Sequence, residues 1–213
     1  ILDSYLSNFK FEKKIISHCK KLVIIDDLKK KHCCDIYINP NLLSFKFTKK
    51  ITAKYKLLGT KFSFIDLPIV KNKKKKIIKF KNILVFMGAT DSKNLSNKIY
   101  NAVSMKKLNY LKFNFIRGLK NKKLKNTKKN NKFKNIRFID FSKNFSNYLR
   151  KTDFFISSGG SSVWDSIFLK KKTLIFNHSW RQFENSNNLN KKGLIKEFNN
   201  KLTKNNILDF IIS

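Results

Sequence analysis

The hydrophobic positions of this 213-residue chain form short runs, mostly continuous, that are separated by amphipathic stretches. Runs rich in β-branched and aromatic residues predict seven strands, at residues 22–26, 36–39, 83–87, 111–116, 136–139, 153–157 and 173–176. Continuous rather than alternating runs are typical of strands buried on both faces of a parallel sheet. Helices are expected between them, at residues 9–20, 94–103, 145–151, 162–169 and 182–192. Strands that alternate with helices predict a doubly wound α/β fold.

Two lysine-rich stretches interrupt this pattern. Residues 71–81 read as a linker between domains, and residues 120–134 as an exposed loop. The formal net charge is +35, but only four of the 48 basic residues are Arg. Proteins that bind nucleic acids usually use Arg, because its guanidinium makes paired hydrogen bonds to bases and phosphates. The lysines here are, in addition, spread along the whole chain. We therefore attribute the charge to an AT-rich codon bias and expect no nucleic-acid partner, with a basic RNA-binding module kept as an alternative.

The cysteine content and the hydropathy of the sequence indicate the compartment in which the protein works. Three cysteines without regular spacing argue against a disulfide framework and favour a reducing, cytoplasmic compartment. No apolar run reaches the roughly 18 residues that span a bilayer, and no signal peptide opens the chain. The first residue is Ile1 rather than Met, so we expect a fragment of a longer protein.

The strongest chemical signal is the segment Ser157-Ser158-Gly159-Gly160-Ser161-Ser162-Val163-Trp164-Asp165, which follows a predicted strand and opens a predicted helix. Glycines allow close approach of the backbone to a ligand, and free N–H groups at the start of a helix favour an anion. The serine hydroxyls add donors for a diphosphate, and Asp165 suits ribose hydroxyls. The alternative is a plain strand-to-helix turn with a serine as N-cap.

Three further groups of residues lie at predicted strand ends, where ligands of parallel sheets gather. The first is Met87-Gly88-Ala89-Thr90-Asp91, whose alternative role is to cap the next helix. The acids Asp26 and Asp27 suit acid–base or metal chemistry, but a structural role is favoured. Arg181, Gln182 and Asn185 suit contacts with a base or a sugar, and the neighbouring His178 is expected to be structural.

Taken in order, these segments resemble the UDP-sugar hydrolases of pseudaminic acid biosynthesis, whose wider relatives include the GlcNAc transferase that makes lipid II. The resemblance rests on the segments Asp3-Ser4-Tyr5, LVIIDDLKKKHCCDIYINPN (22–41), KYKLLGTKFSF (54–64), ILVFMGATD (83–91), SSGGSSVWD (157–165) and RQFENSNNL (181–189). The chain departs from the family pattern at Ala89, Asp165, Arg181 and Asp66, which stand where Gly, Glu, Asn and Arg are usual.

The resemblance implies a GT-B-like fold of two Rossmann-like domains, an incomplete one at residues 1–75 and a UDP-binding one at residues 76–213. It implies nucleotide contacts from Gly88, Ser158, Gly159, Gly160, Ser161, Ser162 and Asp165, and substrate contacts from Tyr5, Asn39, Asn41, Gln182 and Asn185. The family's general-base His has no counterpart here and would lie before Ile1, so no catalytic residue is assigned to this chain.

The expected activity is hydrolysis of a UDP-linked diacetamido-trideoxy sugar, with no cofactor and no metal. A glycosyltransferase of the same fold and a non-catalytic remnant remain as alternatives.

Overall fold

The computed structural model describes residues 1–28, 30–42, 49–65, 82–104, 108–124, 131–142, 144–177 and 180–213, with the backbone alone at Trp180 and Arg181. The chain divides into two compact units, unit 1 (Ile1–Phe64) and unit 2 (Ile65–Ser213). The expected domain boundary at residues 75 and 76, and the linker at residues 71–81, lie outside the described residues.

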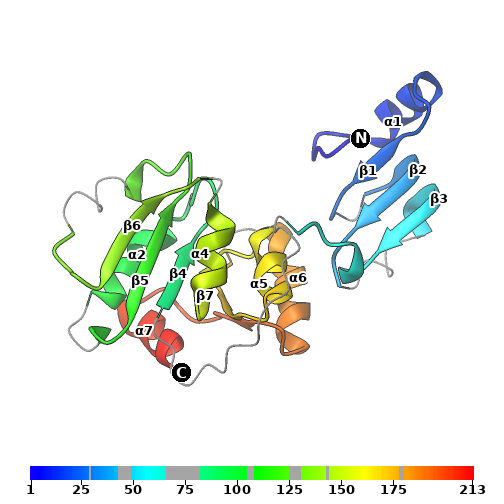
Figure 1. Ribbon diagram of the computed structural model, residues 1–213. Coiled ribbons are helices and arrows are strands. Elements are labelled where there is room, and N and C mark those ends of the chain that lie inside the picture. Colours follow the sequence, from blue (N-terminus) through cyan, green and yellow to red (C-terminus); the bar gives the residue numbers. More distant parts are fainter. Residues whose placement is uncertain are drawn as a thin grey trace. The chain divides into compact units, whose positions relative to one another are not determined.

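Unit 1 contains a three-stranded parallel sheet in the order β1-β2-β3 (Figure 1). Its strands are β1 (Val23–Ile25), β2 (His32–Asn39) and β3 (Ile51–Leu58), and the helix α1 (Phe9–Ile15) continues into a 3-10 turn at Ile16–His18. The side chain of Asn8 caps α1 by accepting a hydrogen bond from the backbone N–H of Phe11. The small core contains Leu22, Ile24, Cys34, Tyr37 and Ile51.

Unit 2 is built on a six-stranded parallel sheet in the order β6-β5-β4-β7-β8-β9 (Figure 1). The strands are β4 (Asn82–Phe86), β5 (Lys112–Arg117), β6 (Ile136–Asp140), β7 (Phe154–Ser157), β8 (Lys172–Ile175) and β9 (Lys196–Glu197). The helices are α2 (Leu95–Val103), α4 (Phe145–Lys151), α5 (Ser162–Phe168), α6 (Trp180–Lys191) and α7 (Lys204–Ile212). Numbered along the chain, the strands lie in the order 3-2-1-4-5-6 of a Rossmann sheet.

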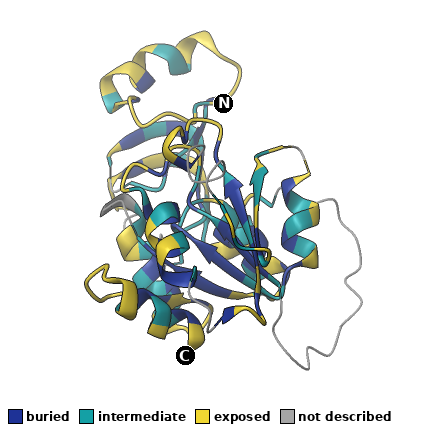
Figure 2. Cartoon of the chain, turned by 90° about the vertical axis from the view of Figure 1, so that its left-hand side faces the viewer, coloured by how far each residue is buried: buried dark blue, intermediate teal, exposed yellow. Residues whose placement is uncertain are grey.

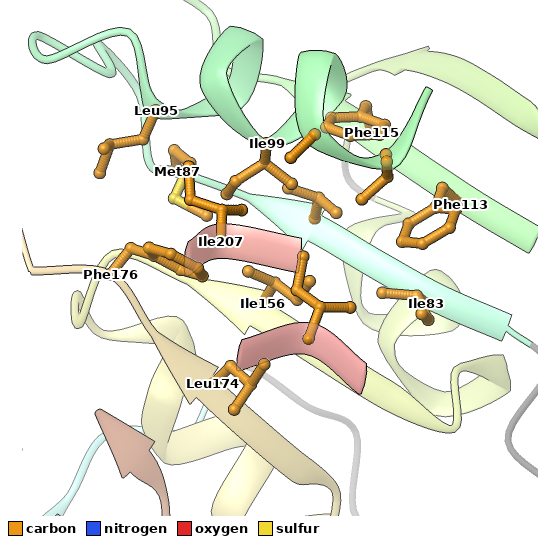
Figure 3. Packing of buried hydrophobic residues seen from close by; sticks show 14 of the residues in the cluster. Ile83, Met87, Leu95, Ile99, Phe113, Phe115, Ile156, Leu174, Phe176 and Ile207 are labelled. Atoms are coloured by element: carbon orange, nitrogen blue, oxygen red, sulfur yellow. The ribbon is translucent and has the colours of Figure 1, made fainter. Parts of the chain in front are cut away.

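Both faces of this sheet are buried, as the continuous apolar runs predicted (Figure 2). Ile83 and Val85 of β4 pack toward α2 and α7, in the larger core drawn in Figure 3. Leu84 lies between them and points to the opposite face, where it joins Phe145 and Leu149 of α4. This alternation follows from the two-residue period of a strand.

Each of the seven predicted strands coincides with an observed strand, and each of the five predicted helices with an observed helix. The strand predicted at 36–39 begins earlier, at His32. The strands β3 and β9 and the helix α7 were not predicted. β3 was missed because its sequence, ITAKYKLL, has four exposed positions and two lysines and so lacks a continuous apolar run. Among the described residues, no helix is long and apolar enough to cross a bilayer.

Candidate functional site

The strand order of unit 2 reverses direction between β4 and β7, which start the two halves of the sheet. In open α/β sheets a ligand binds outside the carboxyl ends of the strands at such a reversal, because the two loops there diverge and leave a crevice. The residues after β4 are Met87 and Gly88, and those after β7 are Ser158 to Ser161. The fold therefore brings the two glycine-containing segments of the sequence to one place.

The loop after β7 runs close to the interior of the unit. Ser158 is buried, and Gly159 has φ +85°, a conformation that favours glycine. A Cβ on Gly159 would lie 2.7 Å from Asn177 Oδ1 and 3.0 Å from Ser186 Oγ, so no larger residue fits without a shift. Ser161 precedes α5 and is exposed, and its side chain makes no capping hydrogen bond. A serine thus occupies the N-cap position, as the alternative interpretation expected, but its hydroxyl does not cap the helix.

The turn after β4 faces this loop. Gly88 has φ +78°, and a Cβ placed on it would lie 3.6 Å from Ser158 Oγ. Asp91 is buried, and its carboxylate accepts hydrogen bonds from Leu95 N (2.7 Å) and Ser96 N (2.9 Å). Asp91 thus caps α2, which is the structural role considered for it.

Gly118 follows β5 and was not singled out from the sequence. A Cβ on it would collide with the backbone oxygen of Gly88 and lie 2.6 Å from that of Ala89. The loop after β5 therefore packs against the β4 turn so closely that only glycine fits.

The start of α6 completes the site. A Cβ on Gly160 would lie 3.7 Å from Gln182 Nε2, so Gln182 lies beside the loop. The Oε1 atom of Gln182 is buried and has no hydrogen-bond partner among the described residues. An unpaired buried amide oxygen costs stability, and a donor on a ligand would satisfy it. Asn185 lies one turn further along α6 and is partly buried.

A polar network supports the loop from behind. Ser186 Oγ donates to Asn177 Oδ1 (3.1 Å), and Asn177 Nδ2 donates to a carboxylate oxygen of Glu197 on β9. Burial raises the pKa of Glu197, and the hydrogen bond from Asn177 partly opposes that rise. The sequence offered no sign of this network, because its members are separated by about ten residues each and meet only through the fold.

The remaining residues expected in the nucleotide site lie on or next to α5 and α6. Ser162 begins α5, and its hydroxyl lies 3.4 Å from Ser157 Oγ. Asp165 is buried one turn into α5. His178 and the side chain of Arg181 lie outside the described part of the chain.

In unit 1, two of the residues expected to contact a sugar, Asn39 and Asn41, lie at the carboxyl end of β2. Tyr5 is exposed, whereas Asn39 is buried at the end of β2. Asn39 Nδ2 donates to Tyr37 Oη (3.1 Å), and Asn39 Oδ1 accepts from Asn41 N (3.0 Å). Asn41 Nδ2 donates to the backbone oxygen of Asp27 (3.3 Å). Asn39 and Asn41 thus join the ends of the two strands, and their contact with a sugar stays a prediction.

A buried charged cluster in unit 1 was missed by the sequence analysis. His32 lies between two carboxylates, with its Nδ1 2.9 Å from Glu12 Oε1 and its Nε2 2.8 Å from Asp26 Oδ2. Glu12 also accepts from Ser7 Oγ (2.7 Å) and Cys33 N (2.9 Å). Burial lowers the pKa of His32, but the hydrogen bonds to Asp26 and Glu12 outweigh it, so the pKa lies above 6.5.

This cluster is structural rather than catalytic. All three side chains are almost fully buried, with exposed fractions of 0% for Glu12, 1% for His32 and 5% for Asp26. Asp26 therefore has the structural role that was favoured for the Asp26-Asp27 pair. Within the described residues, no group of three or more His, Cys, Asp or Glu side chains is arranged to hold a metal ion.

Comparison with known proteins identifies a matching family and solved structures with a similar fold. The profile of the Glycosyltransferase family 28 C-terminal domain matches residues 82–208. No curated protein sequence matches the chain.

Several solved structures have similar folds, with TM-scores above 0.5. A putative UDP-N-acetylglucosamine 2-epimerase from Listeria monocytogenes has a TM-score of 0.58 and 14% identity, over 84% of this chain and 50% of that one. MurG from Acinetobacter baumannii has a TM-score of 0.56 and 13% identity, over 83% and 57%. MnaA from S. aureus, solved with UDP, has a TM-score of 0.56 and 18% identity, over 84% and 50%.

At these identities the likeness concerns the fold, and it confirms the GT-B-like α/β class predicted from the sequence. The chain spans between 50% and 57% of the length of these three solved chains.

Proposed function

Because the chain belongs to glycosyltransferase family 28, whose C-terminal domain matches residues 82–208, we propose that unit 2 binds the UDP portion of a nucleotide sugar. The binding site lies at the carboxyl ends of β4 and β7. In the enzyme, this site holds the diphosphate while the bond between the sugar and the diphosphate is broken.

The observation that carries this proposal is the meeting of Gly88 with the loop Ser158–Gly160 where the strand order reverses. The two segments come from opposite halves of the sheet, and each presents backbone without a bulky side chain. Such a crevice suits a diphosphate, whose oxygens accept hydrogen bonds from backbone N–H groups and hydroxyls. The positive charge of the chain adds long-range attraction for the anion.

Polar side chains around the loop are suited to contact the phosphates, the ribose and the base or sugar. The exposed hydroxyl of Ser161 is suited to a phosphate oxygen, and the buried Oε1 of Gln182 to an N–H group of the base or sugar. Asp165, one turn into α5, is suited to the ribose hydroxyls, in line with the resemblance found in the sequence.

For the reaction itself, we propose hydrolysis of a UDP-linked diacetamido-trideoxy sugar. Water attacks the anomeric carbon, the bond from that carbon to the diphosphate oxygen breaks, and UDP leaves with the bonding electrons. Groups that hold the diphosphate would stabilise the charge that develops on it. The resemblance of the sequence motifs to the hydrolases is what favours hydrolysis over sugar transfer, and the general base is expected outside this chain. Transfer to an acceptor hydroxyl uses the same site, and product analysis with the full-length enzyme distinguishes the two.

The nucleotide assignment is tested by replacing Gly160 with alanine in the full-length protein. The added methyl would make an ordinary 3.7 Å contact with Gln182 Nε2, so folding should be little affected. The same methyl would occupy space beside the phosphates, and we expect UDP affinity to fall about tenfold or more, since overpacking a fitted site costs about 1–3 kcal/mol. Isothermal titration calorimetry with UDP measures the effect.

Gly193→Ala is the control outside the site: its φ of +69° adds backbone strain that Gly160→Ala lacks, but a Cβ there meets nothing within 4 Å and Gly193 lies past the end of α6. This variant should bind UDP as the parent does. Equal affinity of Gly160→Ala and the parent would remove the loop from the site, and absence of UDP binding by the parent would refute the nucleotide assignment.

A further inference from the structure

A large cavity lies at the end of the unit 2 sheet opposite to the proposed nucleotide site. Its volume is 730 Å³, within the ~300–1,000 Å³ of small-molecule sites. The sheet contributes residues from the amino ends of its strands, among them Ile83 of β4, Phe154 of β7 and Lys172 of β8. Gly88 and Ser158 follow the carboxyl ends of β4 and β7, so the cavity and the nucleotide site are separate.

The interior of the cavity is apolar. Ile83 and Leu174, both labelled in Figure 3, belong to the main core, and Ile211 of α7 lies on the same wall. At the mouth, the apolar side chains are not covered by the protein: Tyr110 is 61% exposed, Leu194 44% and Ile212 55%. Exposed apolar side chains around a cavity indicate a site that binds an apolar group.

The rim carries charge of one sign. Lys170, Lys172 and Lys196 line the cavity and are exposed. Lys196 Nζ is held near the mouth, since it donates to Ser213 Oγ (2.7 Å) and lies 5.3 Å from the centre of the Phe210 ring. Lys171 has a different role, because its ammonium donates to the backbone oxygens of Arg150 and Thr152. The lining residues that the structure describes include no Asp or Glu.

We propose that this cavity binds an anionic amphiphile, with the hydrocarbon chain inside and a carboxylate or phosphate head group among Lys170, Lys172 and Lys196. The apolar interior has no group that would stabilise a small anion. A purely apolar ligand would make no ionic contact with the lysines of the rim. The hollow shape and volume suit a single chain better than a flat protein surface. This inference does not depend on the function proposed for the carboxyl ends of β4 and β7.

The test is calorimetric titration of the full-length protein with decanoate below its micelle concentration, and with 1-decanol as the uncharged comparison. We expect saturable binding of one decanoate and weaker binding of the alcohol. Leu194→Asp places a carboxylate among the apolar groups of the mouth and should weaken decanoate binding about tenfold or more. The double variant Lys170→Glu, Lys172→Glu should weaken binding of decanoate but not of decanol.

Matched controls separate this site from general attraction by a very basic chain. Lys10→Glu with Lys14→Glu makes the same change of net charge on exposed positions of unit 1, and Leu119→Asp changes an exposed leucine outside the cavity. Both should bind decanoate as the parent does. The proposal fails if decanoate binding is not saturable or if the controls weaken it as much as the cavity variants. It also fails if Leu194→Asp abolishes self-association in size-exclusion chromatography, because a second copy would then be the occupant.

Discussion

Replacing His32 with leucine is expected to unfold unit 1, or to raise the equilibrium constant for its opening by about two to four orders of magnitude. The variant leaves Glu12 and Asp26 facing each other in the interior without the cation between them. Removing one partner of a buried ion pair costs about 3–5 kcal/mol, because the remaining charges stay desolvated. Since unit 1 has a small core and one short sheet, this loss is comparable to its whole stability.

The thiol of Cys34 provides the measurement. Burial raises its pKa to about 12, so alkylation requires that β2 open first. We expect fast modification of Cys34 in the variant and slow modification in the parent, located by mass spectrometry. His18→Leu is the matched control, because His18 is exposed and contacts its sequence neighbours Lys14 and Ser17. Slow modification in both variants would show that the buried cluster does not stabilise unit 1.

The same cluster makes the stability of unit 1 depend on pH. The pKa of His32 is raised in the folded state, so its contribution is fully present below its ordinary value of 6.5. That contribution is lost as pH rises from there through the folded pKa. The rate of Cys34 modification, corrected for the reactivity of an unfolded peptide, should therefore increase as pH rises above 6.5. An equal increase in His32→Leu would contradict this linkage.

Replacing Gly159 with alanine is expected to destabilise unit 2 by about 2–5 kcal/mol. Its φ of +85° is strained for any residue with a Cβ, which costs about 1–2 kcal/mol. The new methyl would also lie 2.7 Å from Asn177 Oδ1 and 3.0 Å from Ser186 Oγ, and overpacking of this kind costs about 1–3 kcal/mol. Asn177 cannot move freely, since it is hydrogen-bonded to both Ser186 and Glu197.

Urea unfolding followed by tryptophan fluorescence measures this loss, because Trp164 lies on α5 next to the loop. Gly193→Ala again serves as control, since its φ of +69° carries the backbone strain without any contact. The difference between the two variants isolates the contact with Asn177 and Ser186. Equal losses would show that this network does not constrain the loop.

Much of unit 2 was predictable because its strands are buried on both faces. β4 and β7 have continuous apolar sequences, and glycines and serines that follow them mark where they end. β3 was missed since its exposed positions carry lysines, and β9 because two residues are too few for a pattern. A signal for α7 was present: Thr203 precedes an apolar stretch and caps the helix by accepting from Asn206 N.

The candidate site was predictable in its parts but not in its assembly. The glycines at 88 and 159 could be singled out from the sequence, whereas their proximity depends on β4 and β7 being neighbours in the sheet. Gly118 and Glu197 could not be recognised from the residues around them. Their contacts are with backbone or side chains that are distant in the sequence. The role of His32, which precedes Cys33 and Cys34, was not recognised, because its partners Glu12 and Asp26 lie in other segments of the chain.

The most direct test of the nucleotide site uses the six glycines of the chain as reporters. The full-length protein, labelled with ¹⁵N-glycine, is titrated with UDP while amide chemical shifts are recorded. The account requires that the signals of Gly88, Gly159 and Gly160 move together and saturate, whereas those of Gly59 and Gly193 stay in place. If UDP leaves the first three unmoved, or shifts Gly59 or Gly193 instead, the nucleotide does not bind at the carboxyl ends of β4 and β7.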